Sequence, residues 1–525
     1  MSTEITQTRY DTVPYPIKSY PQTHPAKTSV IARLFGMTPA PVEKCRVLEL
    51  GCAHGGNLVP MAQSLPESQF VGIDLSQRQV EAGKKMIEGA GLKNIELRHA
   101  NIVDINPTDL GTFDYVIVHG VFSWVKKEVQ DKILKIAHDC LNPQGLAYVS
   151  YNTLPGWRMR GMLREMMLFH TSQFPDEATK AKQGYALVNF LHENVDAKDN
   201  PYGLLLQREL ETIKNYDVSY FLHDFLAETN EPCYFHEFIG RAMGHGLQYL
   251  GESSFASMLV QNLPEKAAAT LQSLSKNIIA TEQYMDFLRN RPFRQTLLCR
   301  RDVQLNRNVS PAVLKDLVLS CPLKPVSAAP SLDAGVKESF QGVNNATINS
   351  EHPYVKAFLL ALVQAQPHPI SFAQAHEKAC AAIQGKAAAP SEQEVNTLLG
   401  LLMNAFSRGL LDVVSWAAPV LAQPSAKPAV TPLARFQAAA GLNVTSARHN
   451  SASVDAFSRK LMLLLDGSRD IEAIVNELVG ACMRKELNVA SDGKTIENEA
   501  QVRQIVATLV PRTLAQLAVA GYLVA

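Results

Sequence analysis

The segment RVLELGCAHGGN, residues 46–57, decides the fold. Its first half is an apolar run of the kind that forms a buried strand, and its second half is rich in glycine. Glycine at a turn from a strand into a helix lets a ligand approach the backbone closely, and the free N–H groups at the start of the helix attract an anion. The segment therefore predicts a strand, a turn and a helix that bind a small molecule.

Apolar strands and amphipathic helices alternate along the chain that follows. We expect strands at 46–51, 69–75, 95–100, 113–120, 146–151, 246–253 and 294–300. Near-continuous apolar strands separated by helices, such as the predicted helices 56–65 and 128–141, indicate a mainly parallel sheet covered on both faces. The sequence therefore predicts a doubly wound, Rossmann-like α/β fold with a seven-stranded sheet, whose ligand lies at the carboxyl ends of the strands.

The flanking parts of the chain differ from this α/β unit. Residues 1–45 are rich in Tyr and Pro, and they form either a disordered tail or a strap over a neighbouring domain. The α/β domain is expected to span 46–305 and to carry a helical insertion at about 160–245, where four segments have helical patterns.

Two further units, 306–420 and 430–525, are separated by an Ala/Pro-rich linker at 416–432. In the first unit, a Ser cap and an acidic first turn predict a strongly apolar helix at 391–414. The pattern of helix, turn, helix and short strand predicts winged-helix-like α+β domains in both units. Their apparent recognition helices carry Leu, Met and Val instead of Arg and Lys, so contacts with protein, or formation of a homodimer, fit better than DNA binding.

Composition and charge exclude several classes of protein. The chain has 525 residues, with 50 Lys+Arg balanced by 50 Asp+Glu, and a sequence pI near 7.2. This balance gives no electrostatic reason to expect nucleic acid or an anionic membrane as a partner. No apolar run approaches the ~20 residues of a membrane span, the N-terminus lacks a signal-peptide pattern, and the cysteines form no C-x-x-C pair. We expect a cytoplasmic protein with reduced cysteines, no metal site and no membrane insertion.

Two acidic residues narrow the choice of ligand. Glu49 lies within the first strand, where a buried carboxylate without a partner is costly, so a cationic group of the ligand would offset that cost. Asp74 ends the second strand, where a carboxylate can accept both hydroxyl groups of a ribose. The turn Gly51-x-Ala53-x-x-Gly56 also fits a dinucleotide-binding pattern, which keeps a nicotinamide-dependent oxidoreductase as an alternative.

Three motifs, VLELGCAHGGN, FVGIDLS and FDYVIVHGV, together resemble class I S-adenosylmethionine (SAM)-dependent methyltransferases over about residues 45–155. The resemblance implies that the glycines shape the loop under the methionine part of SAM and that Glu49 interacts with that loop and with the amino group. It also implies that Asp74 holds the ribose, that Leu75 packs on adenine, and that Asn101 replaces an acid that often contacts the adenine amino group. The implied cofactor-binding residues are Glu49, Gly51, Cys52, Ala53, Gly55, Asn57, Asp74, Leu75, Asn101, Ile102 and His119.

Two aromatic-rich loops follow the fourth and fifth strands, HGVFSWV at 119–125 and SYNTLPGW at 150–157. The second loop is similar to the N-P-P-[YFW] motif of amino-base methyltransferases, but it has one proline in place of two adjacent ones and follows the wrong strand. An aromatic wall suits an alkylammonium group and its apolar stem, although core packing would explain each aromatic residue singly. Tyr151 or Asn152 would align an acceptor amine, and His119 would accept its proton. The candidate catalytic residues are His119, Trp124, Tyr151, Asn152 and Trp157.

A wider resemblance covers about residues 9–300. With YDTVPYP, HDFLAETNEPCYFHEF and DFLRNRPFRQTLLC added, the chain is similar to bacterial protein lysine methyltransferases that modify rickettsial outer-membrane proteins, whose relatives carry a methyltransferase regulatory domain. The resemblance implies methyl transfer to lysine ε-amino groups of a protein, such as an outer-membrane protein. If the N-terminal segment folds over the site, Tyr10 and Tyr15 would close it. A small-molecule methyltransferase and a non-catalytic SAM-binding regulatory protein are the alternatives.

Overall fold

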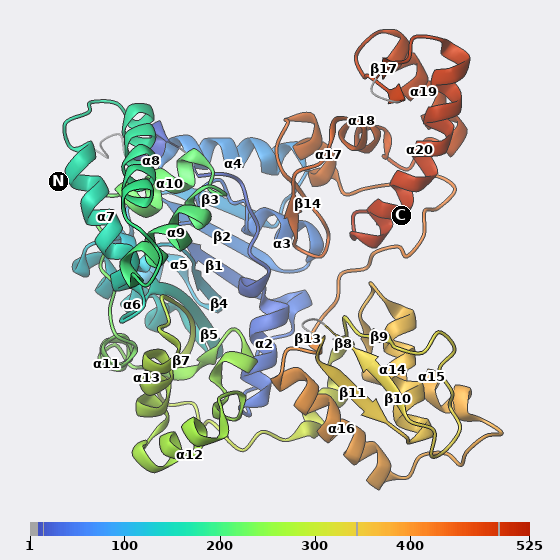
Figure 1. Cartoon of the computed structure of the whole chain (residues 1–525), viewed down its shortest axis with the longest axis horizontal. Helices are drawn as coiled ribbons and strands as arrows, with labels where there is room; N and C mark the ends of the chain where they lie inside the picture. Colours follow the sequence, from blue (N-terminus) through green and yellow to red (C-terminus); the bar gives the residue numbers. More distant parts are fainter. Residues whose placement is uncertain (1–8, 14, 343–344, 492–493, 525) are drawn as a thin grey trace.

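The computed structural model describes residues 9–13, 15–342, 345–491 and 494–524 (Figure 1). Its centre is a seven-stranded sheet in the order β3-β2-β1-β4-β5-β7-β6, in which β7 is antiparallel to both of its neighbours and the remaining pairs are parallel. The strands are β1 (Arg46–Leu50), β2 (Gln69–Asp74), β3 (Ile95–His99), β4 (Phe113–Val118), β5 (Leu141–Asn152), β6 (Leu247–Glu252) and β7 (Phe293–Arg300). The predicted Rossmann-like α/β fold is confirmed.

The register of β1 explains where a ligand can bind. β1 lies between β2 and β4, and Glu49 is paired with Gly72 on one side and with Ile117 on the other. β1 and β4 are neighbours although β2 and β3 lie between them in the chain, so the winding direction reverses at this point. A crevice opens at the carboxyl ends of the strands at such a switch point.

Helices surround the sheet, and a helical insertion joins β5 to β6 (Figure 1). The turn into this insertion requires glycine, because a Cβ at Gly156 would collide with the backbone of Asn290 and Arg291. The helices next to the sheet are α3 (Leu58–Ser64), α4 (Gln77–Gly89), η3 (Ile102–Asp104), α5 (Pro107–Leu110), η4 (Phe122–Trp124) and α6 (Lys127–Cys140). Those between β5 and β7 are α7 (Trp157–Thr171), α8 (Glu177–Asn194), α9 (Pro201–Ile213), α10 (Val218–Leu226), α11 (Phe235–Gly244), η5 (Phe255–Met258), η6 (Val260–Asn262), α12 (Glu265–Leu274) and α13 (Ile278–Arg289).

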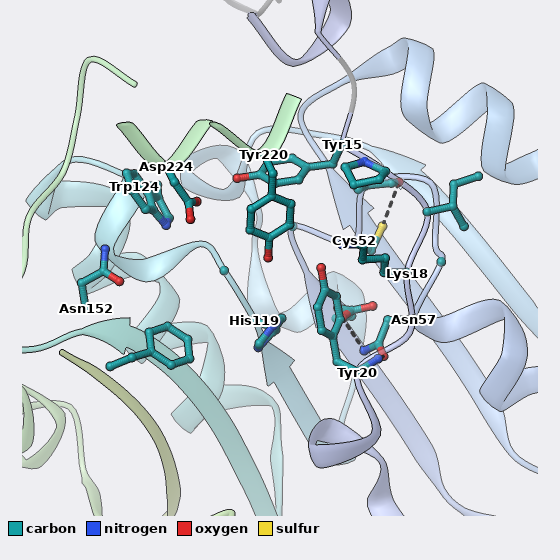
Figure 2. A pocket seen from close by; sticks show the side chains of 18 of the residues that line it. Tyr15, Lys18, Tyr20, Cys52, Asn57, His119, Trp124, Asn152, Tyr220 and Asp224 are labelled. Atoms are coloured by element: carbon teal, nitrogen blue, oxygen red, sulfur yellow. Dashed lines mark hydrogen bonds between the residues drawn. The ribbon is translucent and has the colours of Figure 1, made fainter. Parts of the chain in front are cut away.

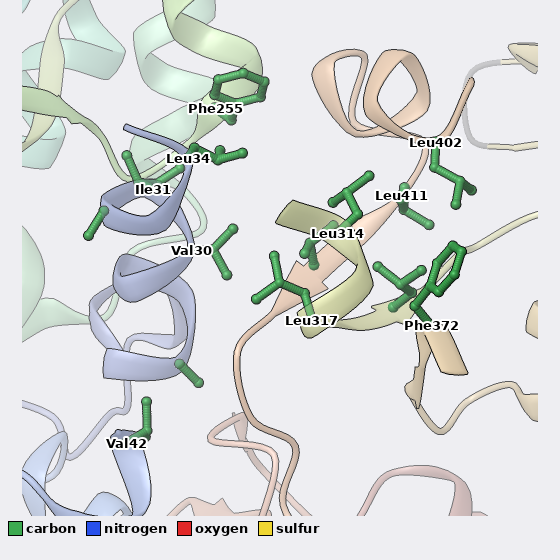
Figure 3. Packing of buried hydrophobic residues seen from close by; sticks show 14 of the residues in the cluster. Val30, Ile31, Leu34, Val42, Phe255, Leu314, Leu317, Phe372, Leu402 and Leu411 are labelled. Atoms are coloured by element: carbon green, nitrogen blue, oxygen red, sulfur yellow. The ribbon is translucent and has the colours of Figure 1, made fainter. Parts of the chain in front are cut away.

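The N-terminal segment lies against the sheet domain. Its elements are α1 (Arg9–Thr12), η1 (Pro21–Thr23), α2 (Pro25–Leu34) and η2 (Val42–Lys44). Helix α2 buries Val30, Ile31 and Leu34 in a hydrophobic core that continues to Leu314 and Leu411 of the middle domain. Figure 3 shows α2 placed between the sheet domain and these middle-domain side chains, so the helix joins the two parts.

The middle domain contains two small sheets, in the orders β12-β8-β13 and β11-β10-β9. The predicted helix 391–414 is wrong at its C-terminal end. α16 stops at Ser407, Gly409 has φ +72°, and the last three residues of the prediction form β13, which pairs with β8. The elements are η7 (Pro311–Asp316), β8 (Val318–Ser320), β9 (Lys324–Pro325), β10 (Glu338–Gln341), β11 (Thr347–Ser350), α14 (Pro353–Ala365), β12 (Ile370–Ser371), α15 (Phe372–Ile383), α16 (Glu392–Ser407) and β13 (Asp412–Val414).

The C-terminal domain is attached to the sheet domain by α17, which lies beside α4 (Figure 1). Leu433 is buried together with Val59 and Met86, and the ring of Phe436 covers Gly89. The elements are α17 (Pro432–Ala439), β14 (Val444–Thr445), β15 (Ser451–Ala452), α18 (Ala456–Leu464), α19 (Ile471–Met483), β16 (Ala490–Ser491), β17 (Lys494–Thr495) and α20 (Glu499–Val519). Throughout the described ranges, no helix combines the length and the apolar character that a membrane span requires.

Candidate active site

The loop between β1 and α3 is shaped by residues with positive φ. Gly51 has φ +75°, and a Cβ at this position would collide with the side chain of Val121. Ala53 has φ +50°, and its N–H donates to Asp74 Oδ2 over 2.7 Å. The other oxygen of Asp74 accepts from the N–H of Ser76 at 2.8 Å. The carboxylate of Asp74 is thereby fixed at the end of β2, where burial raises its pKa.

A cavity of about 160 Å³ lies at the carboxyl ends of β2 and β3. The residues expected to hold adenosine all line it, namely Asp74, Leu75, Asn101 and Ile102. The valines of the β4–α6 region, Val121, Val125 and Val129, give the cavity an apolar wall. A planar ring with a hydroxylated sugar therefore fits the shape and chemistry of this space.

Glu49 is 3% exposed and has one oxygen without a partner. Its Oε1 accepts a hydrogen bond from Asn57 Nδ2 at 2.8 Å, whereas its buried Oε2 has no hydrogen-bond partner among the described residues. Burial raises the pKa of Glu49 to about 8, and the hydrogen bond from Asn57 opposes this rise. An unsatisfied buried acceptor of this kind favours a ligand that brings a hydrogen-bond donor or a positive charge.

A second cavity, of about 290 Å³, opens beside the first (Figure 2). The two share Tyr15, Gly51, Ala53, Gly120 and Trp124, so they lie next to each other. Figure 2 shows Trp124, Asn152 and Asp224 on one side of the second cavity and Tyr20 and Asn57 on the other. The predicted site residues that line it are Glu49, Gly51, Cys52, Ala53, Asn57, His119, Trp124, Asn152 and Trp157.

The N-terminal segment passes over this space. The ring of Tyr15 stacks on His223 of α10 with centroids 4.2 Å apart, and Tyr20 lies 4.1 Å from the ring of His119. Lys18 Nζ lies 4.9 Å from the centroid of the Tyr220 ring. The segment therefore connects the sheet to the helical insertion across the cavity. The side chain of Tyr10 lies outside the part of the chain that the structure describes, as do residues 1–8.

The helical insertion contributes residues that the sequence interpretation did not select. Tyr216, Tyr220 and Asp224, from α10 and the turn before it, line the second cavity with Trp124 and Trp157, whose rings are 6.0 Å apart. Burial raises the pKa of Asp224 to about 6, and the positive charge of Arg160 limits this rise. One signal was available, because Asp224 is the only acidic residue of the mainly apolar segment VSYFLHDFL.

His119 is placed in the cavity but in a setting that weakens it as a base. Its Nδ1 lies 3.0 Å from the hydroxyl of Tyr148, and its ring is enclosed by Tyr20 and Phe293. Burial lowers the pKa of His119 to about 4. The imidazole is therefore neutral at pH 7 and holds a proton less well than the carboxylate of Asp224, which disfavours the predicted role of proton acceptor.

Tyr151 does not reach the cavity, in contrast to its predicted role in aligning an acceptor. It is 1% exposed, its ring stacks on Phe238, and its hydroxyl lies 3.1 Å from Thr296 Oγ1. Successive side chains of a strand point to opposite faces, so Asn152 faces the cavity and Tyr151 faces the core. Gly55 does not line either cavity. Its φ of +72° allows the backbone of the loop to turn, and the side chains of Leu97 and Val59 pack over it.

Three parts of the chain match known domains. Residues 47–145 match a methyltransferase domain, residues 217–300 a predicted methyltransferase regulatory domain, and residues 426–522 the C-terminal winged helix domain of PKMT. An uncharacterized protein of Rickettsia prowazekii is 35% identical over 504 residues, which are 94% of this chain and 90% of the relative. The structure of PKMT2 from Rickettsia typhi is 33% identical, with a TM-score of 0.87, and the match covers 97% of this chain and 100% of that one. The chain belongs to the PKMT family of methyltransferases.

Membership of the PKMT family decides between the two cofactor interpretations of the glycine-rich loop. A second structure of PKMT2, in complex with AdoHcy, is also 33% identical, with a TM-score of 0.86 over 98% of this chain and 100% of that one. The PKMT methyltransferase described here has SAM as its cofactor, and the nicotinamide-dependent alternative is not supported. The winged-helix character predicted for the C-terminal domain is confirmed.

The cavity residues of this PKMT methyltransferase fit SAM. SAM carries an ammonium group, and the unpartnered Oε2 of Glu49 is a buried acceptor for one. SAM also carries a ribose and an adenine, and the smaller cavity offers the fixed carboxylate of Asp74 beside an apolar wall. The two cavities adjoin at Gly51 and Ala53, which places the methionine part of SAM beside the loop between these groups.

Proposed function

We propose that this methyltransferase transfers the methyl group of SAM to lysine ε-amino groups of a protein. The observation that carries the proposal is the half-buried carboxylate of Asp224 among aromatic rings, in the same cavity that contains Glu49. An aromatic enclosure attracts an alkylammonium group through cation–π contact and accepts its apolar stem. The membership of a family named for protein lysine methyltransferases supports the same acceptor.

The proposal assigns the cofactor to the two adjoining cavities. Glu49 Oε2 would accept the ammonium group of SAM, and Asp74 would accept the ribose hydroxyls. Leu75 and Ile102 would pack on adenine, and Asn101 would accept from its amino group. Gly51, Cys52, Ala53 and Gly55 form the turn that allows this close approach, with Asn57 behind Glu49.

The acceptor lysine would enter from the side of Trp124 and Trp157. Asp224 would attract its ammonium group, and Asn152, which also lines the cavity, would orient it by accepting a hydrogen bond at its side-chain oxygen. A lysine must be neutral to react, and deprotonation at pH 7.4 from a pKa near 10.4 costs roughly 4 kcal/mol. Removal of the amine from water lowers its pKa and so reduces that cost, whereas the cation–π contacts and the charge of Asp224 favour the ammonium and serve its binding. Asp224, with a pKa of about 6, holds a proton better than His119, with a pKa of about 4.

When bound, SAM supplies a sulfonium, which is an activated methyl donor. The lysine nitrogen would attack the methyl carbon as the carbon–sulfur bond breaks, leaving S-adenosylhomocysteine and a methylammonium that loses its proton. The protein's contribution is alignment of the amine and exclusion of water. Tyr15 and Tyr20 serve the second purpose, because the N-terminal segment that carries them lies across the cavity.

Incubation with methyl-labelled SAM tests the proposal. Purified enzyme would be supplied with fractionated bacterial envelope proteins and, separately, with cytosolic proteins, and labelled bands would be analysed by mass spectrometry. We expect methyl groups on lysine side chains, with outer-membrane proteins as the first fraction to test. Asp224→Asn, which keeps the size of the side chain, is the matched control and should lower labelling. Label on no protein, despite SAM binding, would favour a small-molecule acceptor or a non-catalytic role.

A further inference from the structure

The hairpin formed by β14 and β15 of the C-terminal domain has a strained residue at its tip. The N–H of Ser446 donates to the carbonyl of Asn450, and the N–H of His449 donates to the carbonyl of Ser446, both at 2.9 Å. His449 has φ +63°, in the left-handed region that favours glycine. A bulky residue persists in that conformation only where its surroundings hold it, and such positions concentrate at functional sites.

Hydrogen bonds from Ser19 of the N-terminal segment hold the tip of the hairpin in place. Ser19 Oγ donates to the carbonyl of His449 at 2.9 Å, and Ser19 N–H donates to Ser451 Oγ at 3.0 Å. At the base of the same domain, Leu433 N–H donates to Gln63 Oε1 at 3.2 Å, next to the apolar contact between α17 and α4. The position of the hairpin relative to the cofactor cavity is thus fixed at both ends.

The side chain of His449 contacts Asn57, the residue that donates a hydrogen bond to Glu49. It is 4% exposed, and its Nε2 lies 2.8 Å from Asn57 Oδ1. Because an amide oxygen only accepts, Nε2 must carry the proton and Nδ1 must be unprotonated. Burial lowers the pKa of His449 well below its ordinary value, and the charge of His24 acts in the same direction, so the ring is neutral.

This contact and the backbone N–H of Tyr20 together hold the Asn57 amide in one orientation. Its Oδ1 accepts from His449 and from the N–H of Tyr20 at 2.9 Å. Its Nδ2 donates to Thr23 Oγ1 at 3.0 Å and to Glu49 Oε1 at 2.8 Å. A flipped amide would place its N–H groups against the N–H of Tyr20 and the donor of His449, and its oxygen against Glu49 Oε1. With the amide held in the observed orientation, Glu49 Oε1 is occupied and Oε2 remains for a ligand.

We propose that His449 is a positioning residue, by which the C-terminal domain fixes the Glu49 carboxylate, through Asn57, for the amino group of SAM. This inference rests on the proposed role of Glu49 in the cofactor site, and it makes the distant winged-helix domain part of that site. It also yields a distinct signature. Loss of the His449 contact should weaken ligands that carry the amino group and spare 5′-methylthioadenosine, which contains the adenosine and sulfur but no amino acid part.

Two substitutions that differ in reach by one methylene test this inference. His449→Gln retains an N–H donor at about the position of Nε2, whereas the amide of His449→Asn ends too far from Asn57. Asn tolerates positive φ better than Gln, so any effect of backbone strain should favour His449→Asn, opposite to the expected effect on binding. Ser446→Ala is the control within the same turn, because the Ser446 hydroxyl has no hydrogen-bond partner among the described residues.

Calorimetric titration of the full-length variants with S-adenosylhomocysteine and with 5′-methylthioadenosine gives the readout, with melting temperatures recorded for each. We expect His449→Asn to bind S-adenosylhomocysteine about tenfold more weakly, as for loss of one hydrogen bond to the carboxylate network, with His449→Gln and Ser446→Ala within about threefold of wild type. All variants should bind 5′-methylthioadenosine equally. Equal weakening of both ligands, or unchanged S-adenosylhomocysteine binding in His449→Asn, would overturn the inference. If the wild type bound 5′-methylthioadenosine but not S-adenosylhomocysteine, both the proposed role of Glu49 and the inference about His449 would be wrong. Normal cofactor binding without protein methylation would contradict only the proposed function.

Discussion

Replacing Glu49 with Gln should weaken cofactor binding in a pH-dependent way. Gln keeps the size of the side chain and an oxygen that can accept from Asn57, but it removes the charge that faces the cavity. A hydrogen bond to a charged group contributes about 1.5–3 kcal/mol, so at pH 8 Glu49→Gln should bind S-adenosylhomocysteine roughly 10- to 100-fold more weakly than wild type.

The pH dependence follows from the environment of Glu49 in the free protein. Burial raises its pKa to about 8, so at pH 6 and pH 7 the carboxyl is mostly protonated. Binding of an ammonium group requires ionisation, which costs about 1.4 kcal/mol for each pH unit below the pKa. A proton is therefore released on binding below pH 8, and the affinity of the wild type should rise with pH, about tenfold per unit from pH 6 to pH 8. Glu49→Gln has no such proton to release, so its affinity should be flat and should approach that of the wild type at pH 6.

Isothermal titration calorimetry at pH 6, 7 and 8 measures the affinity of wild type and Glu49→Gln for S-adenosylhomocysteine and the change of each affinity with pH. Repeating each titration in two buffers of different ionisation enthalpy counts the protons released, which should fall from about one at pH 6 to about half at pH 8. Glu96→Gln is the control, because Arg98 lowers the pKa of that exposed carboxylate and keeps it ionised throughout this range. Wild-type affinity that does not change between pH 6 and pH 8, or equal affinities of wild type and Glu49→Gln at pH 8, would refute the assignment.

Three further substitutions separate the cofactor half of the cavity from the acceptor half. Asp74→Ala removes a carboxylate that is held by two backbone N–H groups, and it should abolish SAM binding in the same calorimetric assay. Trp157→Ala should leave SAM binding intact and reduce turnover, because Trp157 contacts Trp124 at the acceptor side; normal SAM binding by both variants would contradict the cofactor assignment. Asp224→Asn should leave the dissociation constant of S-adenosylhomocysteine within about twofold and lower kcat/KM for a lysine-containing protein roughly 10- to 100-fold, as for loss of one charged hydrogen bond. Unchanged kcat/KM would remove Asp224 from the acceptor site.

The sheet and the cofactor half of the site could be predicted because both depend on short stretches of sequence. A strand such as β1 is buried on both faces and is therefore apolar, and the residues at its carboxyl end meet the ligand directly. Asp74, Leu75, Asn101 and Ile102 follow strands in the same way, and they line one cavity. The acceptor side differs, because Tyr220 and Asp224 come from α10, and His449 comes from another domain, 392 positions beyond the Asn57 that it contacts. The segment VSYFLHDFL marks Asp224 as unusual but does not indicate which residues it meets, and no local pattern indicates the contact of His449 with Asn57.

The error at Tyr151 had a physical cause that the sequence did contain. β5 extends to Asn152, and neighbouring residues of a strand face opposite sides. The side chain of Ser150 lies on the same face of β5 as that of Asn152, opposite to Tyr151. Its Oγ accepts a hydrogen bond from the N–H of Gly120 at 2.8 Å. Tyr151 and Asn152 could not both have faced the acceptor unless the strand had ended one residue earlier. The position of the strand end therefore decided which residue reached the cavity.

Two buried polar atoms of the cavity without hydrogen-bond partners among the described residues explain how the cavity selects its ligands. Glu49 Oε2 and Asn152 Nδ2 are both buried, and neither has a hydrogen-bond partner among the described residues. An unmade buried hydrogen bond costs about 1–3 kcal/mol, so the free protein is less stable than its packing would permit. That cost is recovered only by ligands with a matching polar atom at each place. Glu49 Oε2 is an acceptor beside the cofactor loop and matches a donor such as the ammonium group of SAM. Asn152 Nδ2, at the end of β5, is a donor and matches an oxygen of the bound protein, such as a backbone carbonyl. His449, Asn57 and the hairpin hold the carboxyl group of Glu49 in place before any ligand binds, so this side chain loses little conformational freedom when SAM binds. The C-terminal domain therefore contributes to the affinity for SAM without contacting the cofactor.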